Sequence, residues 1–263
     1  MRQRFKSLLE DVERKKNSRI ILALDVVAES SEKIFSKSMQ ILDEVHEYVC
    51  ALKINHHLVL PLGLFSGVKR ILDRAKDLGL PAIMDCKAND VGSTNRIIAE
   101  NYFKAGFDAL IANPLIGWED GVQPIFEVAK KMGRGVILLV YMSHKAAWEG
   151  YGQKIYDEKT GTIKPQYIVF AEKALAWRAD GVIVGATYPE KISEVYAVLR
   201  GSVPIYSPGV GVQGGDIERA ILAGARYLIV GRSIVEDKDP AEAARRLRDA
   251  SNKIISNVGH RAA

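Results

Sequence analysis

The chain is organised around one stretch, Leu80-Pro81-Ala82-Ile83-Met84-Asp85-Cys86-Lys87-Ala88-Asn89-Asp90. Its apolar first half predicts a short buried strand that runs into charged residues. Successive side chains of a strand point to opposite faces, so Asp85 and Lys87 share one face and Cys86 takes the other. Charges at the end of a buried strand are costly unless they are paired, so they indicate either an ordinary ion pair or a functional site.

This strand is one of eight short apolar runs, each followed by turn residues and then by a helix-like stretch. The other runs cover residues 19–25, 48–54, 109–112, 136–141, 181–185, 203–207 and 227–231. Continuous apolar strands suit a parallel sheet that is covered on both faces. Eight strand–helix alternations predict a closed (β/α)8 barrel of the TIM type, and an open doubly wound sheet is the less regular rival.

The length of 263 residues fits one such barrel, so we expect a single domain over residues 1–263. Residues 1–18 are expected to form an N-terminal helical extension. Apolar residues recur there at helical spacing, which indicates an amphipathic helix packed on the barrel. They are Phe5, Leu8, Leu9 and Val12. Helices are also expected over residues 67–78, 94–104 and 215–223.

Composition narrows the class of partner and the compartment. The net charge of +5 suits an anionic small molecule, and no dense basic tract with interleaved aromatic residues predicts nucleic-acid binding. No apolar run is long enough to span a bilayer, and no signal-peptide pattern opens the chain. The two cysteines, Cys50 and Cys86, each stand in an apolar run, which favours a reducing compartment. We therefore expect a cytoplasmic protein that binds neither nucleic acid nor membrane.

Charged residues collect where successive strands are predicted to end. Asp25 ends the first strand, Lys53 lies near the end of the second, and Asp85 with Lys87 ends the third. The reactive residues of a (β/α)8 barrel lie at these carboxyl ends. The second and third strands are neighbours, so we expect Lys53 to reach Asp85 in an alternating array that Asp90 could extend.

A second group of residues follows the last two strands. The seventh strand runs into a glycine-rich loop over residues 207–216, and the eighth runs into Gly231-Arg232-Ser233-Ile234. Glycines let backbone N–H groups approach an anion, and loops at these two positions are the usual phosphate site of such barrels. Arg232 adds a charged fork for phosphate oxygens. The pattern predicts a phosphorylated ligand.

The motifs together resemble those of the orotidine 5'-monophosphate decarboxylase family. Residues 85–90, followed by Val91, Thr94 and Asn95, resemble its Asp-x-Lys-x-x-Asp signature, and residues 207–216 resemble its phosphate-gripping loop. Further matches occur in the same order from Arg19 to the last helix. They are Leu24-Asp25, Leu52-Lys53-Ile54, Met142-Ser143-His144, Gly185-Ala186-Thr187-Tyr188-Pro189 and Val230-Gly231-Arg232-Ser233-Ile234.

The resemblance implies an enzyme that decarboxylates orotidine 5'-monophosphate to uridine 5'-monophosphate and CO2, the last step of de novo pyrimidine synthesis, with no metal or other cofactor. Lys87 would protonate C6 of the pyrimidine, and Asp85 would sit against the substrate carboxylate. Lys53 and Asp90 would hold the charged array in place. In the family the second aspartate comes from the partner subunit, so the resemblance implies a homodimer in which Asp90 completes the neighbouring site.

The resemblance also implies roles in substrate binding. Asp25, Lys53 and Thr94 would bind the ribose hydroxyls. Ser143 would read the pyrimidine ring, and Pro208 would close its loop over the base. The phosphate would be bound by Gln213, Gly231 and Arg232.

Some residues depart from the family pattern. Val91-Gly92-Ser93 stand where many members have Ile-Pro, and Lys145-Ala146 replace a common Pro-Gly. The missing proline leaves the rigidity of the turn after Asp90 open. The connection over residues 143–166 is long and expected to be irregular, either covering the active site or forming a surface insertion.

Two alternative functions are weighed against the decarboxylase. One is a magnesium-dependent barrel of the 3-keto-L-gulonate-6-phosphate decarboxylase or hexulose-6-phosphate synthase type, which shares the Asp-x-Lys-x-x-Asp motif. Its metal ligands include a glutamate on a neighbouring strand, and no acidic residue stands beside Lys53 here. The other is a non-catalytic barrel that binds a nucleotide, which has no need of four charged residues in one array.

Overall fold

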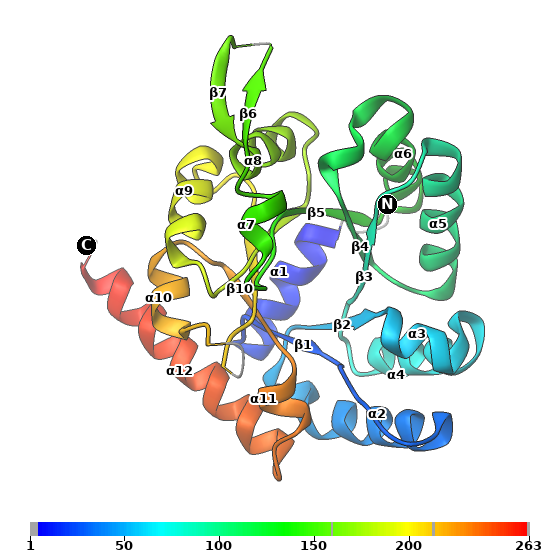
Figure 1. Cartoon of the computed structure of the whole chain (residues 1–263). Helices are drawn as coiled ribbons and strands as arrows, with labels where there is room; N and C mark the ends of the chain where they lie inside the picture. The colour runs from blue at the N-terminus through cyan, green and yellow to red at the C-terminus, as the bar shows by residue number, and fades with distance from the viewer. Residues whose placement is uncertain (1–4, 159, 212–213, 262–263) are drawn as a thin grey trace.

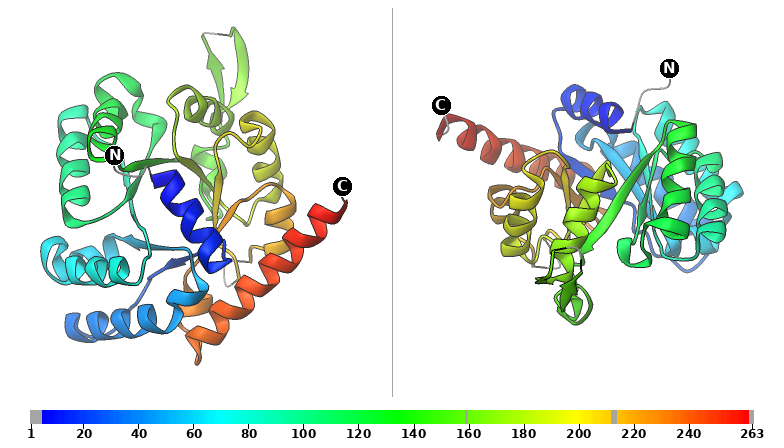
Figure 2. Two further views of the ribbon diagram at one scale, coloured as in Figure 1. Left: turned by 180° about the vertical axis from the view of Figure 1, so that it is seen from behind. Right: turned by 90° about the horizontal axis from the view of Figure 1, so that it is seen from above.

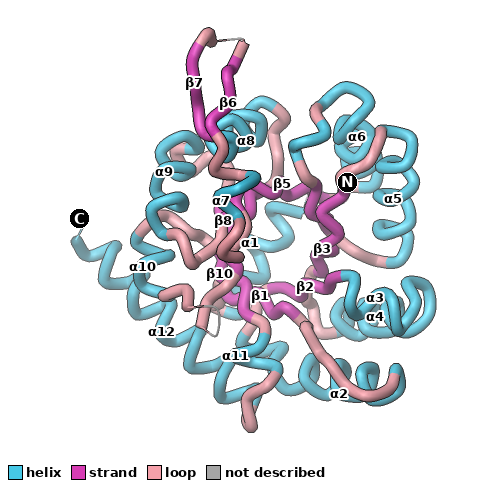
Figure 3. The backbone as a smooth tube through the Cα atoms, viewed as in Figure 1, coloured by secondary structure: helices cyan, strands magenta, loops and turns pink. Residues whose placement is uncertain are grey.

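The computed structural model describes residues 5–158, 160–211 and 214–261. Eight parallel strands close into a barrel in the order β1-β10-β9-β8-β5-β4-β3-β2 (Figures 1 and 3). The prediction of a (β/α)8 barrel is therefore confirmed. The strands are β1 (Ile20–Ala23), β2 (Ala51–Asn55), β3 (Ala82–Ala88), β4 (Ala109–Ala112), β5 (Gly135–Tyr141), β8 (Gly181–Val184), β9 (Ile205–Pro208) and β10 (Tyr227–Val230).

Helices surround the barrel and cover the outward faces of its strands. Besides the N-terminal helix, the larger ones are α2 (Ser31–Val45), α3 (His56–Leu62), α4 (Lys69–Asp77), α5 (Gly92–Ala105), α6 (Gln123–Met132), α8 (Gln166–Ala176), α9 (Pro189–Leu199), α10 (Ile217–Leu222) and α12 (Pro240–Arg261). Short helical turns complete the connections. They are η1 (His46–Tyr48), η2 (Gly63–Val68), η3 (Pro114–Ile116), η4 (Trp118–Val122), α7 (Ala147–Gly150) and α11 (Arg232–Val235). Because both faces of the strands are buried, their sequences are apolar without alternation.

The N-terminal helix α1 (Phe5–Lys16) closes the end of the barrel opposite the mouth that Figure 1 faces. Figure 2 shows it lying across that end. Phe5, Leu9 and Val12 are buried. The ring of Phe5 lies so close to Gly135 that a Cβ there would come within 2.6 Å of it, so only glycine fits at this position. The amphipathic pattern of this segment thus seals the barrel.

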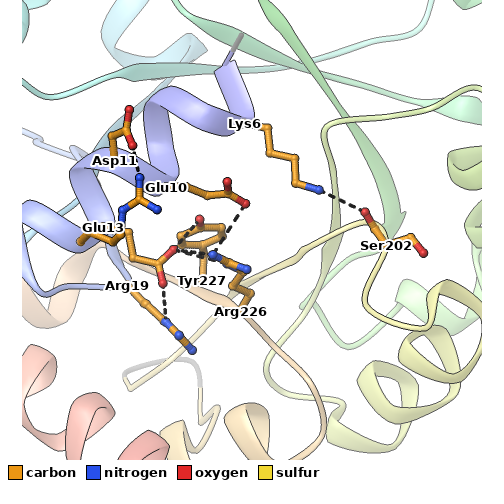
Figure 4. Close-up of polar contacts among 9 residues, drawn as sticks. Lys6, Glu10, Asp11, Glu13, Arg19, Ser202, Arg226 and Tyr227 are labelled. Atoms are coloured by element: carbon orange, nitrogen blue, oxygen red, sulfur yellow. Dashed lines mark hydrogen bonds and ion pairs between the residues drawn. The ribbon is translucent and has the colours of Figure 1, made fainter. Parts of the chain in front are cut away.

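One carboxylate fixes this helix to the barrel floor (Figure 4). Glu13 is buried and pairs with Arg19 at 2.7 Å and with Arg226 at 3.0 Å. It also accepts a hydrogen bond from the Tyr227 hydroxyl at 2.8 Å. Burial raises the pKa of Glu13, but hydrogen bonds from Tyr227 and Arg226 outweigh it and the net shift is downward.

The structure differs from the sequence prediction at several element boundaries. Tyr48 belongs to the turn η1, and the second strand begins only at Ala51. The helix expected from residue 67 begins at Lys69, because η2 precedes it. The connection expected to be irregular contains the antiparallel hairpin β6 (Lys154–Asp157) and β7 (Thr162–Pro165), which projects from the barrel in Figure 1. No residue of these two strands is buried, so the sequence carries no alternating apolar pattern that would predict the hairpin.

Replacing Glu13 with Gln is expected to lower the free energy of unfolding by about 2 kcal/mol, because it leaves two guanidinium groups without their shared anion. The effect is discounted for the partial exposure of both arginines. Urea denaturation measures the change. Glu10→Gln on the same helix is the control, since Glu10 lies 3.7 Å from Arg226 and partly in solvent, and its loss should cost no more than about 1 kcal/mol. Equal losses in both variants would contradict the role given to Glu13.

Candidate active site

A cavity of about 190 Å³ opens at the mouth of the barrel, where the strands end. Its lining combines charged residues on β2 and β3 with apolar side chains and, across the barrel, with glycine-rich backbone after β9 and β10. The lining residues are Ala23, Asp25, Lys53, Asn55, Asp85, Lys87, Ile111, Leu139, Met142, Ser143, Ile183, Pro208, Gly209, Val210, Ile229, Gly231, Arg232 and Ser233. The residues predicted from strand ends and those predicted for a phosphate site thus face one another across a single space.

A carboxylate between two ammonium groups forms the charged side of the cavity. Lys53 Nζ donates to Asp85 Oδ2 at 2.8 Å, and Lys87 Nζ donates to Asp85 Oδ1 at 2.6 Å. The predicted contact of Lys53 with Asp85 is confirmed. The side chains of Lys53 and Asp85 are largely buried, whereas the Lys87 side chain is 36% exposed, so Lys87 is the more accessible of the two ammonium groups.

The two lysines fix the charge state of Asp85. Burial by itself raises its pKa, but the charges and hydrogen bonds of Lys53 and Lys87 outweigh this effect and lower the pKa to about 2. Asp85 is therefore an anion at neutral pH, and the array carries two positive charges around one fixed negative charge.

The backbone of β3 is distorted where it presents this array. Strand β3 continues through the motif to Ala88, and its pairing with β4 shifts register between Met84 and Ala88. Lys87 itself has φ of 48°, a left-handed conformation that non-glycine residues seldom adopt. Such local strain is held in place only by surrounding structure and is concentrated at functional sites.

The opposite wall is built from the loops after β9 and β10. Pro208, Gly209 and Val210 follow β9, while Gly231 and Arg232 follow β10. A Cβ on Gly231 would lie 2.9 Å from Asp25 Oδ2. Glycine at this position therefore lets the loop after β10 approach the Asp25 carboxylate closely. Gln213, a predicted phosphate ligand, lies outside the described residues.

Ser143 is fixed at the cavity edge by β8 and the turn after it. Thr187 Oγ1 donates to the Ser143 carbonyl at 2.9 Å, and Tyr188 donates to the carbonyl of His144 at 2.9 Å. Gly185 packs directly under Ser143, since a Cβ there would lie 2.6 Å from its Cα. These contacts hold the start of the long connection in place.

Two predicted residues do not line the cavity of the single chain. Asp90 is exposed, and its side chain accepts a hydrogen bond from its neighbour Val91 N at 2.8 Å. It makes no ion pair with any residue in the described ranges. Thr94 is exposed on the first turns of α5. Within one chain Asp90 therefore does not extend the array, and the role of Asp90 in the site of a partner subunit stays a prediction.

The structure adds one polar residue that the sequence argument missed. Asn55 lines the cavity at the end of β2 and donates from Nδ2 to Asp25 Oδ1 at 3.2 Å. Its Oδ1 accepts from His57 N and caps α3. The sequence could have predicted this position, because Asn55 stands two residues after Lys53 and side chains two apart on a strand point to the same face.

Residues 5–158, 160–211 and 214–261 contain neither a candidate metal site nor a candidate membrane span. No three His, Cys, Asp or Glu side chains there are grouped to hold a metal ion. None of the helices in the same ranges combines the length and the apolar character needed to cross a bilayer.

Fold and site together define a (β/α)8 barrel with a Lys-Asp-Lys array facing a glycine-rich loop and an arginine. The family model of the orotidine 5'-phosphate decarboxylase / HUMPS family matches residues 18–247. The orotidine 5'-phosphate decarboxylase of Thermococcus kodakarensis is 37% identical over 238 residues, which cover 90% of this chain and 99% of that protein. The chain belongs to this family.

Solved structures agree with this assignment. Orotidine 5'-monophosphate decarboxylase from Methanocaldococcus jannaschii, complexed with the inhibitor BMP, is 29% identical with a TM-score of 0.75, covering 89% of this chain and 99% of that one. The Leishmania donovani OMP decarboxylase has a TM-score of 0.80 at 24% identity, covering 96% of this chain and 98% of that one, a likeness of fold.

The pKa of Asp85 predicts a pH dependence of stability. Because this pKa is about 2 in the folded chain and about 3.9 in an unfolded one, the ionised carboxylate stabilises the fold above about pH 4. That contribution, about 2 kcal/mol, is lost as the pH falls from about 4 to about 2. Urea denaturation of the wild type and Asp85→Asn should show a stability difference that shrinks by this amount over that range. A difference independent of pH would contradict the array.

Proposed function

We propose that this chain decarboxylates orotidine 5'-monophosphate to uridine 5'-monophosphate and CO2, the last step of de novo pyrimidine synthesis. The observation that carries the proposal is the array of Lys53, Asp85 and Lys87 facing Arg232 across one cavity. The identity of 33–37% to curated orotidine 5'-phosphate decarboxylases over most of the chain supports it. We also propose that the enzyme works in the cytoplasm.

Different residues of the cavity bind different parts of the substrate. The nucleotide phosphate binds Gly231, Arg232 and the loop after β9, far from the reacting carbon. Arginine holds phosphate oxygens in a bidentate manner, and backbone N–H groups complete the site. Binding energy from this remote group stabilises a closed complex and offsets unfavourable contacts at the reacting centre. Ser143 reads the pyrimidine, and Asp25 and Lys53 bind the ribose hydroxyls.

The reacting carboxylate of the substrate is placed against Asp85. Two anions in contact destabilise the bound substrate, and this repulsion is relieved as the C6–carboxylate bond breaks and neutral CO2 leaves. The electron pair of that bond remains on C6, where no cofactor or conjugated group accepts it. Since Lys53 and Lys87 lower the pKa of Asp85 to about 2, Asp85 is already an anion at neutral pH when the substrate binds.

Lys87 stabilises and then quenches this carbanion. Its ammonium is fixed by Asp85 at 2.6 Å and is the most exposed member of the array. A preorganised charge beside a developing negative charge stabilises it most in a site that excludes water. Lys87 then gives one proton to C6 and becomes a neutral amine, which regains a proton from solvent.

We propose that the active enzyme is a homodimer in which Asp90, with Thr94 beside it, enters the partner's site. Exposed apolar side chains stand on the helical segments that follow β2, β3 and β4, three neighbouring strands of which β3 leads to Asp90, which fits burial against a second copy of the chain. They are Leu60 on α3, Phe65 on η2, Val91 at the start of α5, Ile97 on α5 and Leu115 on η3.

An assay with orotidine monophosphate, followed spectrophotometrically with and without EDTA, tests the reaction. We expect turnover that survives the chelator, and no turnover in Lys87→Ala although uridine monophosphate still binds. Turnover that needs magnesium would favour the hexulose-phosphate synthase type of enzyme instead. Binding of the nucleotide without any turnover by the wild type would favour a non-catalytic barrel. Undiminished activity of Lys87→Ala would refute its role as proton donor.

Replacing Arg232 with Ala is expected to raise KM for the nucleotide because a charge-assisted pair with the phosphate is lost. A loss of about 1.5–3 kcal/mol corresponds to roughly tenfold to a hundredfold in affinity. Binding of uridine, which lacks the phosphate, should be unchanged, and calorimetry with both ligands measures the difference. Arg245→Ala on the exposed face of α12 is the matched control. Equal losses for uridine and uridine monophosphate would remove the phosphate assignment.

A further inference from the structure

We propose that Asn95 is a positioning residue that fixes the turn carrying Asp90 in the geometry needed for the active site. The inference rests on the proposed function, because it assigns Asp90 a role in catalysis. It also accounts for how this chain holds that turn without the proline that many family members have there.

Asn95 is a fully buried amide on α5. Its Nδ2 donates to the carbonyl of Asp90 at 2.5 Å and to the carbonyl of Gly121 at 2.9 Å. Both partners can only accept, so the orientation of the amide is fixed by their chemistry. Asn95 thus ties the turn after β3 to η4, the turn that leads into α6.

The remaining atom of this side chain shows that packing alone does not explain it. Asn95 Oδ1 is buried and has no hydrogen-bond partner among the described residues. An unsatisfied buried acceptor costs stability, of the order of 1–3 kcal/mol. A residue selected only for a stable core would avoid that cost, whereas one needed for its two N–H donors must bear it.

A close backbone contact supports the same arrangement. A Cβ on Gly92 would lie 2.6 Å from Asp120 Oδ1 and 3.0 Å from the Asp120 carbonyl, so no larger residue fits at this position. Asp120 is itself held at φ of 50° within η4. The hydrogen bonds of Asn95 and the close approach at Gly92, together called the clamp, therefore hold the turn after β3 against η4.

The clamp acts on Asp90 through the backbone. The Asp90 carbonyl is bound by Asn95, and the Asp90 carboxylate accepts from Val91 N, so both ends of the residue are fixed although it is exposed. An exposed carboxylate held in this way is prepared for a partner outside the chain. Preorganisation of this kind lowers the entropy lost when a second copy of the chain docks.

A double-mutant cycle tests the inference. Asn95→Ala should lower kcat on the order of tenfold to a hundredfold, because displacing a catalytic group by about 1 Å costs that much. Asp90→Ala with Asn95→Ala should lose no more than Asp90→Ala alone, since the two residues act as one unit. Independent, additive losses would overturn the inference. Asn252→Ala, which removes an amide donor to the Asn17 carbonyl on the far end of the barrel, should leave kcat unchanged.

Mixed dimers separate a positioning role from a general loss of stability. When Asn95→Ala subunits are combined with Lys87→Ala subunits, one site per dimer has an intact Lys87 and an intact partner Asp90, so it should turn over at the wild-type rate. A folding defect in the Asn95→Ala subunit would persist in that site and prevent recovery. Failure here, while Asp90→Ala with Lys87→Ala does recover, overturns the inference.

The same series keeps the two proposals apart. If mixed dimers of Asp90→Ala and Lys87→Ala subunits also fail to recover activity, the proposal that Asp90 enters the partner's site is wrong. The double-mutant cycle then still decides the role of Asn95. Wild-type turnover tests the decarboxylase itself. Should Asn95→Ala fold poorly, Asn95→Ser retains one donor and should give a smaller loss of kcat. Thermal denaturation of each variant monitors the fold, and a kcat loss that follows the melting temperature in both variants would contradict positioning.

Discussion

The structure depends on one electrostatic constraint, a carboxylate buried between two ammonium groups at the mouth of a barrel. Asp85 is stable in that place only because Lys53 and Lys87 each donate a hydrogen bond to it. Taking away either ammonium removes one of the two hydrogen bonds that hold Asp85 as a buried anion, so all three residues act as a unit. The distorted end of β3, with Lys87 in a left-handed conformation, is the backbone cost of presenting the unit to a ligand.

Contacts at both ends of the barrel hold this arrangement in place. At one end, α1 seals the floor with Phe5 and anchors itself through Glu13. At the other end, glycines at 185 and 231 bring neighbouring strand ends close enough for Ser143 and Asp25 to face the cavity. A rigid frame of this kind lets fixed charges act on a reacting atom without reorganising, which is the main way that such charges lower a barrier.

The sequence predicts the parts of this design that are set by local chemistry. Apolar runs without alternation predict the parallel strands, and the spacing of Lys53, Asp85 and Lys87 at strand ends predicts their contact, because neighbouring strands of a barrel end together. Features that depend on tertiary contacts are missed. Asn55 at the end of β2 reaches Asp25 just after the neighbouring strand β1, and the hairpin strands β6 and β7 have no buried residue and so no periodic signal. The placement of Asp90 outside the cavity follows from the turn that Asn95 holds, and no local pattern specifies it.

A crystal structure with uridine monophosphate bound tests the central claim most directly. The distance between C6 of the pyrimidine and Lys87 Nζ should be about 3–3.5 Å, as required for a group that transfers a proton to that carbon. The phosphate should lie on Arg232 at the opposite wall. A nucleotide bound with its phosphate against Lys53 and Lys87, or with C6 turned away from Lys87, would contradict the mechanism.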